Sequence, residues 1–489
     1  MSPKTSKSYP PFSALYSSSA NGIARPVRCT PVYEQLRASS GTPVTIYTQD
    51  DPTFPTPDAI DDTALEHSFH LNIDTVPTLI RIENGVETAR TVGWLRSDWE
   101  AITGMTGLGA DLPAARPGCG ARNVMPGIAE ELQVRYGETG MTARQIAVGD
   151  YVDEWEYAFE QGWSDGLPVV PPTPARVYRM LQGTSRKPEE VVGVIPPNQN
   201  ACTVEKVAIN AVMAGCKPEY MPVVLAAVEA ALLDEFCMHG VLATTYHVGP
   251  VVIVNGPIAR QIGMNSGVNA LGQGNRANAT IGRALQLVIR NVGGGRPGEV
   301  DRAVMGNPGK YTFCFAEREA DSPWESLAVE RGFAPEQSTV TLFAGDGIHP
   351  IMDQLSRTPE SLARSFALAL RGVCHPKAAM GSDAILLVCP EHSRTFREAG
   401  WSKARLYEEL TSLLTTDGKE LLRGAGDNAE GIPEAALQSA PDGQISKFRA
   451  GGLLIVHVGG TAGMFSGIIG GWPGSGPRGT VPVTVVIGG

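Results

Sequence analysis

The sequence is short of positive charge and of long apolar runs, and both shortages exclude classes of function. It has 40 lysine and arginine residues against 51 aspartate and glutamate residues, which gives a net charge of −11. No basic run is interleaved with aromatic residues, so nucleic acid is not expected as a partner. No uncharged apolar run approaches the roughly 18 residues that a membrane span needs, so no membrane association is expected.

Cysteine is also scarce, with eight in 489 residues, and these do not form a dense disulfide framework. The first twenty residues are rich in serine and proline and lack the apolar core of a signal peptide. Both features favour a reducing, cytoplasmic setting. We therefore interpret the cysteines as thiols or metal ligands, in a chain long enough for two or three domains.

The chain is expected to divide into a tail, a small domain, a connector and a large body. Residues 1–22 predict a disordered tail, and residues 23–106 predict a domain with the order helix, strand, hairpin, helix. In its hairpin, two runs of strand-forming residues flank Asn84-Gly85, a dipeptide that suits a two-residue turn. Residues 107–150 predict a Gly/Pro-rich connector, and residues 151–489 predict the body.

The domain at 23–106 resembles the thioredoxin-like family. Its stretch "VPTLIRIENGVETARTVGW" is similar to the cis-proline and hairpin region of that family, with Pro77 in the place of the proline. "CTPV" places Cys29 where the family has its first active-site cysteine, and Val32 stands in the place of the second. The resemblance implies a thioredoxin-like fold for this domain and thiol exchange at Cys29.

Two cysteines of this N-terminal part have a chemical reason to react. Cys29 directly precedes a predicted helix, whose N-terminal dipole favours the thiolate form, and Arg28 adds positive charge. Because a lone thiolate cannot resolve its own mixed disulfide, a second thiol is needed. Cys119, in a loop between two glycines, is the candidate. The alternative is that Cys29 is inactive and that Cys119 is a tolerated loop residue.

The body alternates short β-branched runs with helical segments, which predicts an α/β sandwich. Five runs are expected to be strands: "GPVVIVNG", "STVTLFAG", "DAILLVCP", "GGLLIVHVGG" and "PVTVVIGG". Buried helices are expected at "VEKVAINAVMAG" and "MPVVLAAVEAALLDEF", and a further helix is expected after the cap Thr173.

The body also shows signs of two pseudo-repeated halves. The segments "VVIVNGPIARQIGMNSG" and "ILLVCPEHSRTFREAGWS" share a plan of strand, proline, arginine and glycine. A cysteine followed two residues later by proline precedes each of them. In this hypothesis Cys216 and Cys374 are equivalent and face a shared cleft.

Four residues of the body are candidates for acid–base or thiol chemistry, namely Cys374, His375, His349 and His392. His349 and His392 each follow a predicted strand, where open α/β sheets bind their ligands. Cys389 and His392 have the spacing C-x-x-H, and Cys374 and His375 would add two ligands. A zinc or iron site is therefore an open alternative to free thiols.

The stretch "ALGQGNRANATIGRALQLVIRNVGGG" fits the spacing of a dinucleotide fingerprint, but no strand directly precedes Gly272, so that interpretation fails. Two interpretations stay open. A helix beginning near Asn278 binds an anion through its free N–H groups and Arg276, with Gly274 and Asn275 beside it. Alternatively, its small residues only allow the helix to pack closely.

A second glycine-rich stretch, "VGGTAGMFSGIIGGWPGSGPRG", follows the strand-like run "LLIVH". We interpret it as a loop, which either lines the mouth of a pocket or lies flexibly at the surface.

The body is similar to an uncharacterised bacterial family near the UGSC-type (seleno)proteins. The similarity is carried by "GWSDGLPVVPPT", "GNRANATIGRALQLVIRNVGGGRPGE", "NPGKYTFCFAERE", "SPWESLAVERGF" and "CPEHSRTFREAGWSK". The selenocysteine-containing motif itself is absent. The resemblance implies an association with thiol or redox chemistry and assigns no catalytic residue.

These features favour a thiol-dependent oxidoreductase that acts on a small anionic substrate. The thioredoxin-like domain would supply or relay a thiol, and a thiol reductant and a second copy of the chain are further partners in this hypothesis. One alternative is a metal-dependent lyase or hydrolase that uses the His and Cys residues of the body as ligands. Another is a non-catalytic protein whose thioredoxin-like domain binds partners. The sequence names no cofactor.

Overall fold

The computed structural model describes residues 12–16, 30–39, 41, 43–52, 58–440 and 442–488. The chain divides into two units, Met1–Thr139 and Gly140–Gly489. Helices and strands alternate in both, so the predicted α/β class is confirmed. Among the described residues, no helix has the length and apolar character that crossing a membrane requires.

In the described part of the first unit, a five-stranded sheet has the order β3-β2-β1-β5-β6. The elements are β1 (Phe12–Tyr16), α1 (Thr30–Ser39), β2 (Val44–Thr48), β3 (Ile60–Asp61), α2 (Glu66–His70), β4 (Thr75–Val76), β5 (Thr78–Glu83), β6 (Val86–Val92), β7 (Trp94–Leu95), α3 (Arg96–Thr103), β8 (Ala115–Arg116), β9 (Cys119–Gly120), η1 (Arg122–Val124) and α4 (Ile128–Tyr136). β1 and β2 are parallel, and β5 runs antiparallel to β1 and β6.

Alternation along the strands gives this sheet two apolar faces. Ile46 and Leu79 pack with residues of α1 and with Trp99 of α3, whereas the neighbouring Tyr47 and Ile80 belong to a cluster on the other face. The predicted hairpin is present, and its turn residues Asn84 and Gly85 have φ angles of 52° and 77°. The Val76–Pro77 peptide bond is cis.

Two predictions for this unit differ from the structure. Phe12–Tyr16, inside the tail expected to be disordered, form β1 because its backbone groups pair with β2 and β5. Part of the expected connector is also ordered, because Ala115–Arg116 pair with β7 and Cys119–Gly120 pair with β4. Residues 1–11 and 17–29 lie outside the described residues.

The first half of the second unit is mainly helical. Its elements are α5 (Glu154–Glu160), α6 (Pro174–Leu181), β10 (Val191–Ile195), β11 (Asn200–Thr203), α7 (Val204–Ala214), η2 (Pro218–Tyr220), α8 (Met221–Ala231), η3 (Asp234–Phe236), α9 (Met238–Ala243), β12 (Gly249–Asn255), α10 (Pro257–Gln261), α11 (Arg276–Asn291), η4 (Pro308–Lys310), β13 (Cys314–Ala316), α12 (Leu327–Glu330) and β14 (Thr339–Met352). The predicted cap of α6 is confirmed, because the Thr173 side chain accepts a hydrogen bond from Arg176 N.

The second half completes the sheet. Its elements are α13 (Pro359–Leu370), β15 (Ala384–Val388), α14 (Pro390–Glu398), α15 (Lys403–Leu414), β16 (Thr415–Asp417), α16 (Gly418–Leu421), η5 (Ala425–Asp427), η6 (Glu434–Ser439), β17 (Gln444–Ser446), β18 (Leu453–His457), β19 (Phe465–Gly471) and β20 (Val483–Val486). In the described part, the seven-stranded sheet has the order β13-β12-β14-β19-β15-β18, and β20 pairs with β14. All five predicted strands of the body are present in it.

The two halves of this sheet repeat one plan. β12 is followed by α10, α11, a parallel strand β13 and an antiparallel strand β14. β15 is followed by α14, α15, a parallel strand β18 and an antiparallel strand β19. The predicted resemblance between the two halves therefore extends to the order and the direction of their elements.

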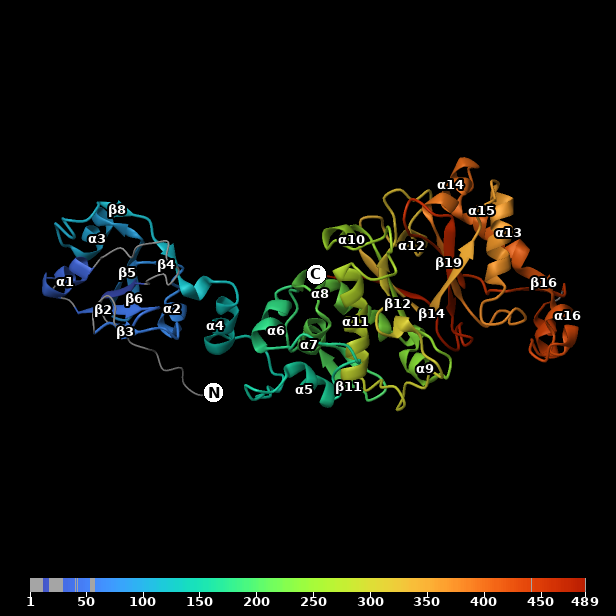
Figure 1. Ribbon diagram of the computed structural model, residues 1–489, viewed down its shortest axis with the longest axis horizontal. Coiled ribbons are helices and arrows are strands. Elements are labelled where there is room, and N and C mark those ends of the chain that lie inside the picture. The colour runs from blue at the N-terminus through green and yellow to red at the C-terminus, as the bar shows by residue number, and fades with distance from the viewer. Residues whose placement is uncertain are drawn as a thin grey trace. The chain divides into compact units, whose positions relative to one another are not determined.

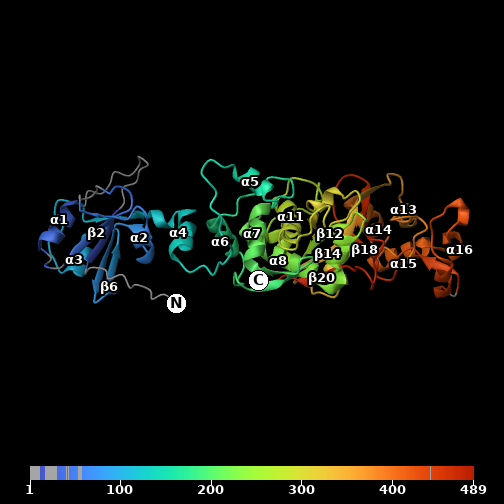
Figure 2. The ribbon, with the colours of Figure 1, turned by 90° about the horizontal axis from the view of Figure 1, so that it is seen from below.

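The sheet is curled, with helices outside it and apolar side chains inside it. Figures 1 and 2 show α8 and α11 beside β12 and β14, with α7 beyond them, and α13, α14 and α15 on the opposite side of the strands. Arg318, two residues after β13, donates its backbone N–H to the carbonyl oxygen of His457 at the end of β18. The enclosed cluster contains Ile253, Phe343 and Ile469 from strands of both halves.

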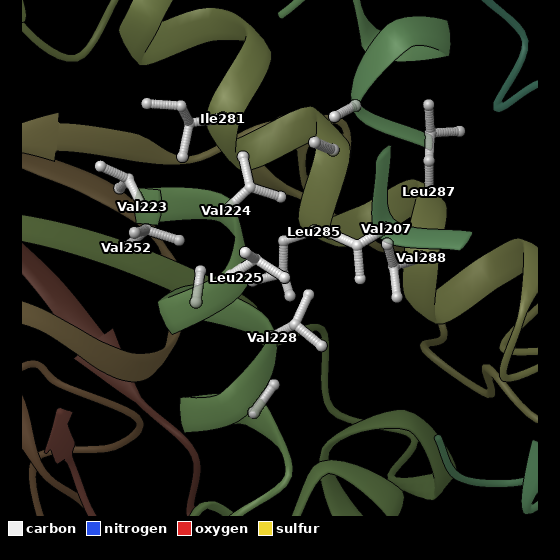
Figure 3. Close-up of a cluster of buried hydrophobic side chains, with 14 of the residues drawn as sticks. Val207, Val223, Val224, Leu225, Val228, Val252, Ile281, Leu285, Leu287 and Val288 are labelled. Carbon is white, nitrogen blue, oxygen red and sulfur yellow. The ribbon is translucent and has the colours of Figure 1, made fainter. Parts of the chain in front are cut away.

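The largest core lies between the sheet and the helices of the first half. Figure 3 shows Leu225 and Val228 of α8 gathered beside Leu285 of α11, and all three are almost fully buried. Each such side chain contributes about 1.5–3 kcal/mol to folding when it is removed from water. This core fixes α8 and α11 against β12 and β14.

The glycine-rich stretch after β18 was predicted to be a loop, and this is wrong for Phe465–Gly471. These residues form β19, in the middle of the sheet between β14 and β15. Glycine is required there by close approach: a Cβ at Gly470 would lie 2.7 Å from the Asp346 carboxylate, and a Cβ at Gly471 would lie 2.7 Å from the Asp383 carbonyl oxygen.

Candidate functional site

The strongest candidate site begins where β15 ends. The apolar run 384–388 forms a fully buried strand, Cys389 then takes the N-cap position of α14, and Pro390 occupies its first turn. Cys389 N donates to Ser466 Oγ at 3.2 Å, and its thiol lies 3.4 Å from the carbonyl oxygen of Gly463. At this position the positive end of the helix dipole stabilises a thiolate.

His392 lies one turn into α14 and faces the same point. Its Nε2 is 2.8 Å from the backbone carbonyl oxygen of Asp353, and its Nδ1 is 2.7 Å from Ser466 Oγ. A carbonyl oxygen only accepts, so Nε2 carries a hydrogen and Nδ1 is the nitrogen that can take up a proton. A base held by a third group beside a nucleophile is the arrangement that activates cysteine in enzymes.

The charges of Cys389 and His392 stabilise each other. Burial alone would raise the pKa of Cys389, but hydrogen bonds from the side chain and backbone of His392 outweigh burial and leave that pKa below its ordinary value. Burial alone would lower the pKa of His392, but its contacts with Cys389 and Asp353 raise it. Each group therefore shifts the other toward its charged form, relative to an isolated thiol and an isolated imidazole.

A glycine-containing loop after β18 encloses this pair. Gly463 N donates to the Glu391 carboxylate at 2.7 Å, and a Cβ at Gly459 would lie 3.9 Å from the Cβ of Cys389. Gly459 N also donates to the carbonyl oxygen of Ser266. Cys389 is 5% exposed, so only a small reagent fits against its sulfur.

A second thiol of the body lies in different surroundings. The Tyr246 hydroxyl is 3.6 Å from Cys374 Sγ and 3.3 Å from the Asp346 carboxylate. Burial raises the pKa of Cys374 and of Asp346. His349 lies 3.7 Å from the same carboxylate, with 67% of its side chain exposed. This group of residues favours a neutral thiol and not a thiolate.

The structure separates the other predicted partners of Cys374. His375 Nδ1 accepts a hydrogen bond from Lys377 N, and the His375 carbonyl oxygen accepts one from Lys447 Nζ, so the residue is part of a turn. Cys216 and Cys374 do not face the shared cleft that was predicted for them. Cys216 is buried against the carbonyl oxygen of Thr280, because it follows α7 and packs on α11, whereas Cys374 follows α13.

Of the two reactive cysteines predicted in the first unit, the structure describes Cys119. Cys119 is exposed, and the residue lies opposite Val76 in the β4–β9 ladder, next to the cis peptide at Pro77. Cys29 lies outside the described residues. The exchange predicted between these two cysteines stays a prediction.

At the start of α11 the polar groups bind the chain itself. Asn275 Oδ1 accepts from Asn278 N, and the buried Asn278 side chain bonds to the backbone of Asn265 and to the Ala270 carbonyl oxygen. Arg276 Nε donates to the carbonyl oxygen of Gly215. The Asn275 and Asn278 side chains and the Nε of Arg276 are therefore occupied, and the geometry favours the close-packing interpretation.

The glycines of the same segment also act in packing. A Cβ at Gly272 would lie 2.2 Å from Asn269 Oδ1, and Gly274 has a φ of 113°. At Gly282, within α11, a Cβ would lie 2.6 Å from Thr312 Oγ1 and 2.9 Å from Phe313 N. The helix therefore approaches the segment before β13 as closely as its backbone permits.

Sequence reasoning missed Asp353, and it placed Ser466 at the mouth of a pocket without connecting it to His392. Ser466 is the second residue of β19, which was predicted to be a loop, and Asp353 follows the last residue of β14. The ladder between these strands pairs Ser466 with Ile351 and thereby brings both partners to His392. Cys389 was noted only for its C-x-x-H spacing. Among the described residues, no three His, Cys, Asp or Glu side chains are grouped to hold a metal ion.

Comparisons with family models, curated proteins and solved structures return no match to this chain.

Proposed function

We propose that the protein is a thiol-dependent oxidoreductase whose body reacts at Cys389, with a thioredoxin-like first unit that relays a thiol. The observation that carries the proposal is the Cys389–His392 pair, in which the thiol lies at a helix N-terminus beside a histidine oriented by the Asp353 carbonyl oxygen. A thiolate is the reactive form of cysteine in exchange with disulfides.

The proposed step is a thiol–disulfide exchange with a small anionic disulfide. The Cys389 thiolate attacks one sulfur of the substrate, a new S–S bond forms, and the old one breaks. The leaving thiolate takes the proton held on the His392 imidazolium. A second thiol, from the first unit or from a thiol reductant, then attacks the mixed disulfide and releases Cys389.

The topology of the first unit supports its part in the proposal. A parallel pair, β1 and β2, is joined by α1, and β5 follows the cis peptide at Pro77 and begins the antiparallel hairpin. That order is the one implied by the resemblance to the thioredoxin-like family. Cys119 is the exposed thiol of this unit among the described residues.

Dithiodiglycolate, a small dianionic disulfide, tests the proposal. We expect mass spectrometry to find the mixed disulfide on Cys389 of the intact protein and to lose it in Cys389→Ser, whereas Cys374→Ser should keep it. An equal yield of mixed disulfide with the uncharged bis(2-hydroxyethyl) disulfide would show that the site does not prefer anionic substrates. Labelling that spares Cys389 while the protein is folded would refute the proposal.

A further inference from the structure

A large cavity of the second unit lies apart from the thiol pair, where α12, α15 and the segment before β18 meet. It has a volume of about 990 Å³, and its walls include Arg331, Tyr407 and Arg449 together with the apolar side chains of Phe448 and Leu454. This volume is at the upper end of the range usual for small-molecule sites.

Arg331 brings a positive charge to this wall without a carboxylate of its own. Its Nε donates to Thr484 Oγ1 at 2.5 Å and its Nη2 to the carbonyl oxygen of Pro482 at 2.7 Å, so two neutral groups hold the guanidinium. Burial lowers the pKa of Arg331. The nearby Glu330 raises that pKa, and the positive charge of Arg449 lowers it again. Among the described residues, Arg331 forms no ion pair.

The acids around the cavity are already paired. Glu330 lies 2.6 Å from the buried ammonium group of Lys403, and burial together with the nearby Glu330 raises the pKa of Tyr407. Asp383 pairs with Arg449 Nη2 at 2.5 Å. The Nε of Arg449 is buried and has no hydrogen-bond partner. Among the described residues Arg331 is thus left without an ion pair, although Glu330 lies near it, and a partly buried cation is stabilised by a directly bound anion.

We propose that this cavity binds an organic carboxylate with an apolar body. The carboxylate would pair with the Nη1 end of the Arg331 guanidinium, because Nε and Nη2 already donate to Thr484 and Pro482. The apolar body would lie against Phe448 and Leu454. This site is independent of the thiol chemistry at Cys389.

Titration calorimetry with 4-phenylbutyrate tests this site in the full-length protein. We expect saturable binding of one equivalent, and binding of the uncharged 4-phenylbutanol at least about tenfold weaker, because a charge-assisted hydrogen bond is lost. Arg331→Gln should weaken the binding of 4-phenylbutyrate by a similar factor. Arg405→Gln is the matched control, because that exposed arginine of α15 pairs with Glu409 and lies outside the cavity walls.

A steric variant keeps the test valid if Arg331→Gln does not fold. Thr411 is an exposed residue of the cavity wall on α15, so Thr411→Trp should fill the space and abolish binding while the arginine remains. Equal binding of the acid and the alcohol, unchanged binding in both variants, or no binding of 4-phenylbutyrate would each overturn the proposal.

Discussion

Cys389 and Cys374 are both largely enclosed thiols of the second unit, yet their neighbours shift their pKa values in opposite directions. Burial raises the pKa at both, and only at Cys389 do a helix N-terminus and a histidine reverse that effect. The comparison shows that burial alone does not decide thiol reactivity, because the hydrogen bonds offered to the sulfur decide which form is stable.

This difference predicts the pH dependence of alkylation. The thiolate is the form that reacts, so a lowered pKa moves the rise in rate to lower pH. For Cys389 we expect a midpoint below the ordinary 9.0, and for Cys374, in the same sample, a midpoint above it. Pulsed labelling with iodoacetamide, followed by peptide mass spectrometry, measures both.

The same labelling in His392→Gln identifies the cause. Loss of the imidazole removes the contact that favours the thiolate, so the midpoint of Cys389 should move up while that of Cys374 stays in place. An unchanged Cys389 midpoint in a folded His392→Gln protein would contradict the thiolate–imidazolium pair.

Lys447 holds the turn that carries Cys374. Its ammonium group is buried and donates to the carbonyl oxygens of Val373, His375 and Ala378 at 2.7–2.8 Å. Lys447→Met removes this shared donor, and only the Val373 and His375 carbonyl oxygens keep a backbone N–H partner, so the change should lower the free energy of unfolding by roughly 1–3 kcal/mol. Urea denaturation measures the change. Lys419→Met, at an exposed position, should be neutral, and an equal loss there would argue against this role.

Among the helices, α11 depends most visibly on a small residue. A Cβ at Gly282 would lie 2.9 Å from the backbone N of Phe313, and backbone cannot rotate away as a side chain can. Gly282→Ala should therefore push α11 off the segment before β13 and destabilise the protein by roughly 1–3 kcal/mol. Thermal unfolding followed by circular dichroism measures it. Gly488→Ala, where a Cβ meets open space, is the control, and an unchanged melting point in Gly282→Ala would contradict close packing.

Elements with local signals were predictable from the sequence. The signal for the hairpin at Asn84 and the signal for the cap at Thr173 each lie within a few consecutive residues, and both features are present. β19 was not predictable, because its glycines suggest a loop and only the approach of Asp346 and Asp383 makes them necessary.

The candidate site was predictable only where its residues are close together in the sequence. The spacing of Cys389 and His392 is visible along one helix, whereas Ser466 and Asp353 reach His392 only through the register between β14 and β19. A sequence without an alignment does not specify such a register.

At the scale of the whole molecule, the division after Thr139 predicts an independent second unit. Its core clusters contain residues of this unit alone, and its start is held because Thr142 N and Ala143 N donate to the Glu205 carboxylate. We expect residues 140–489, produced alone, to unfold cooperatively and to keep the alkylation midpoint of Cys389. Calorimetry and labelling check both. A fragment without a cooperative transition would show that this unit needs residues 1–139.

The contact between Arg318 and His457 also bears on self-association. An open sheet ends in strands whose free N–H and C=O groups can recruit a strand from another molecule and begin aggregation. Here the chain beyond β13 bonds to the last residue of β18 through Arg318 N, and the His457 ring nitrogen Nδ1 lies 2.9 Å from the Arg318 carbonyl oxygen. The curl thus turns the edges at β13 and β18 toward each other, which protects these two edges against edge-to-edge polymerisation without an additional element.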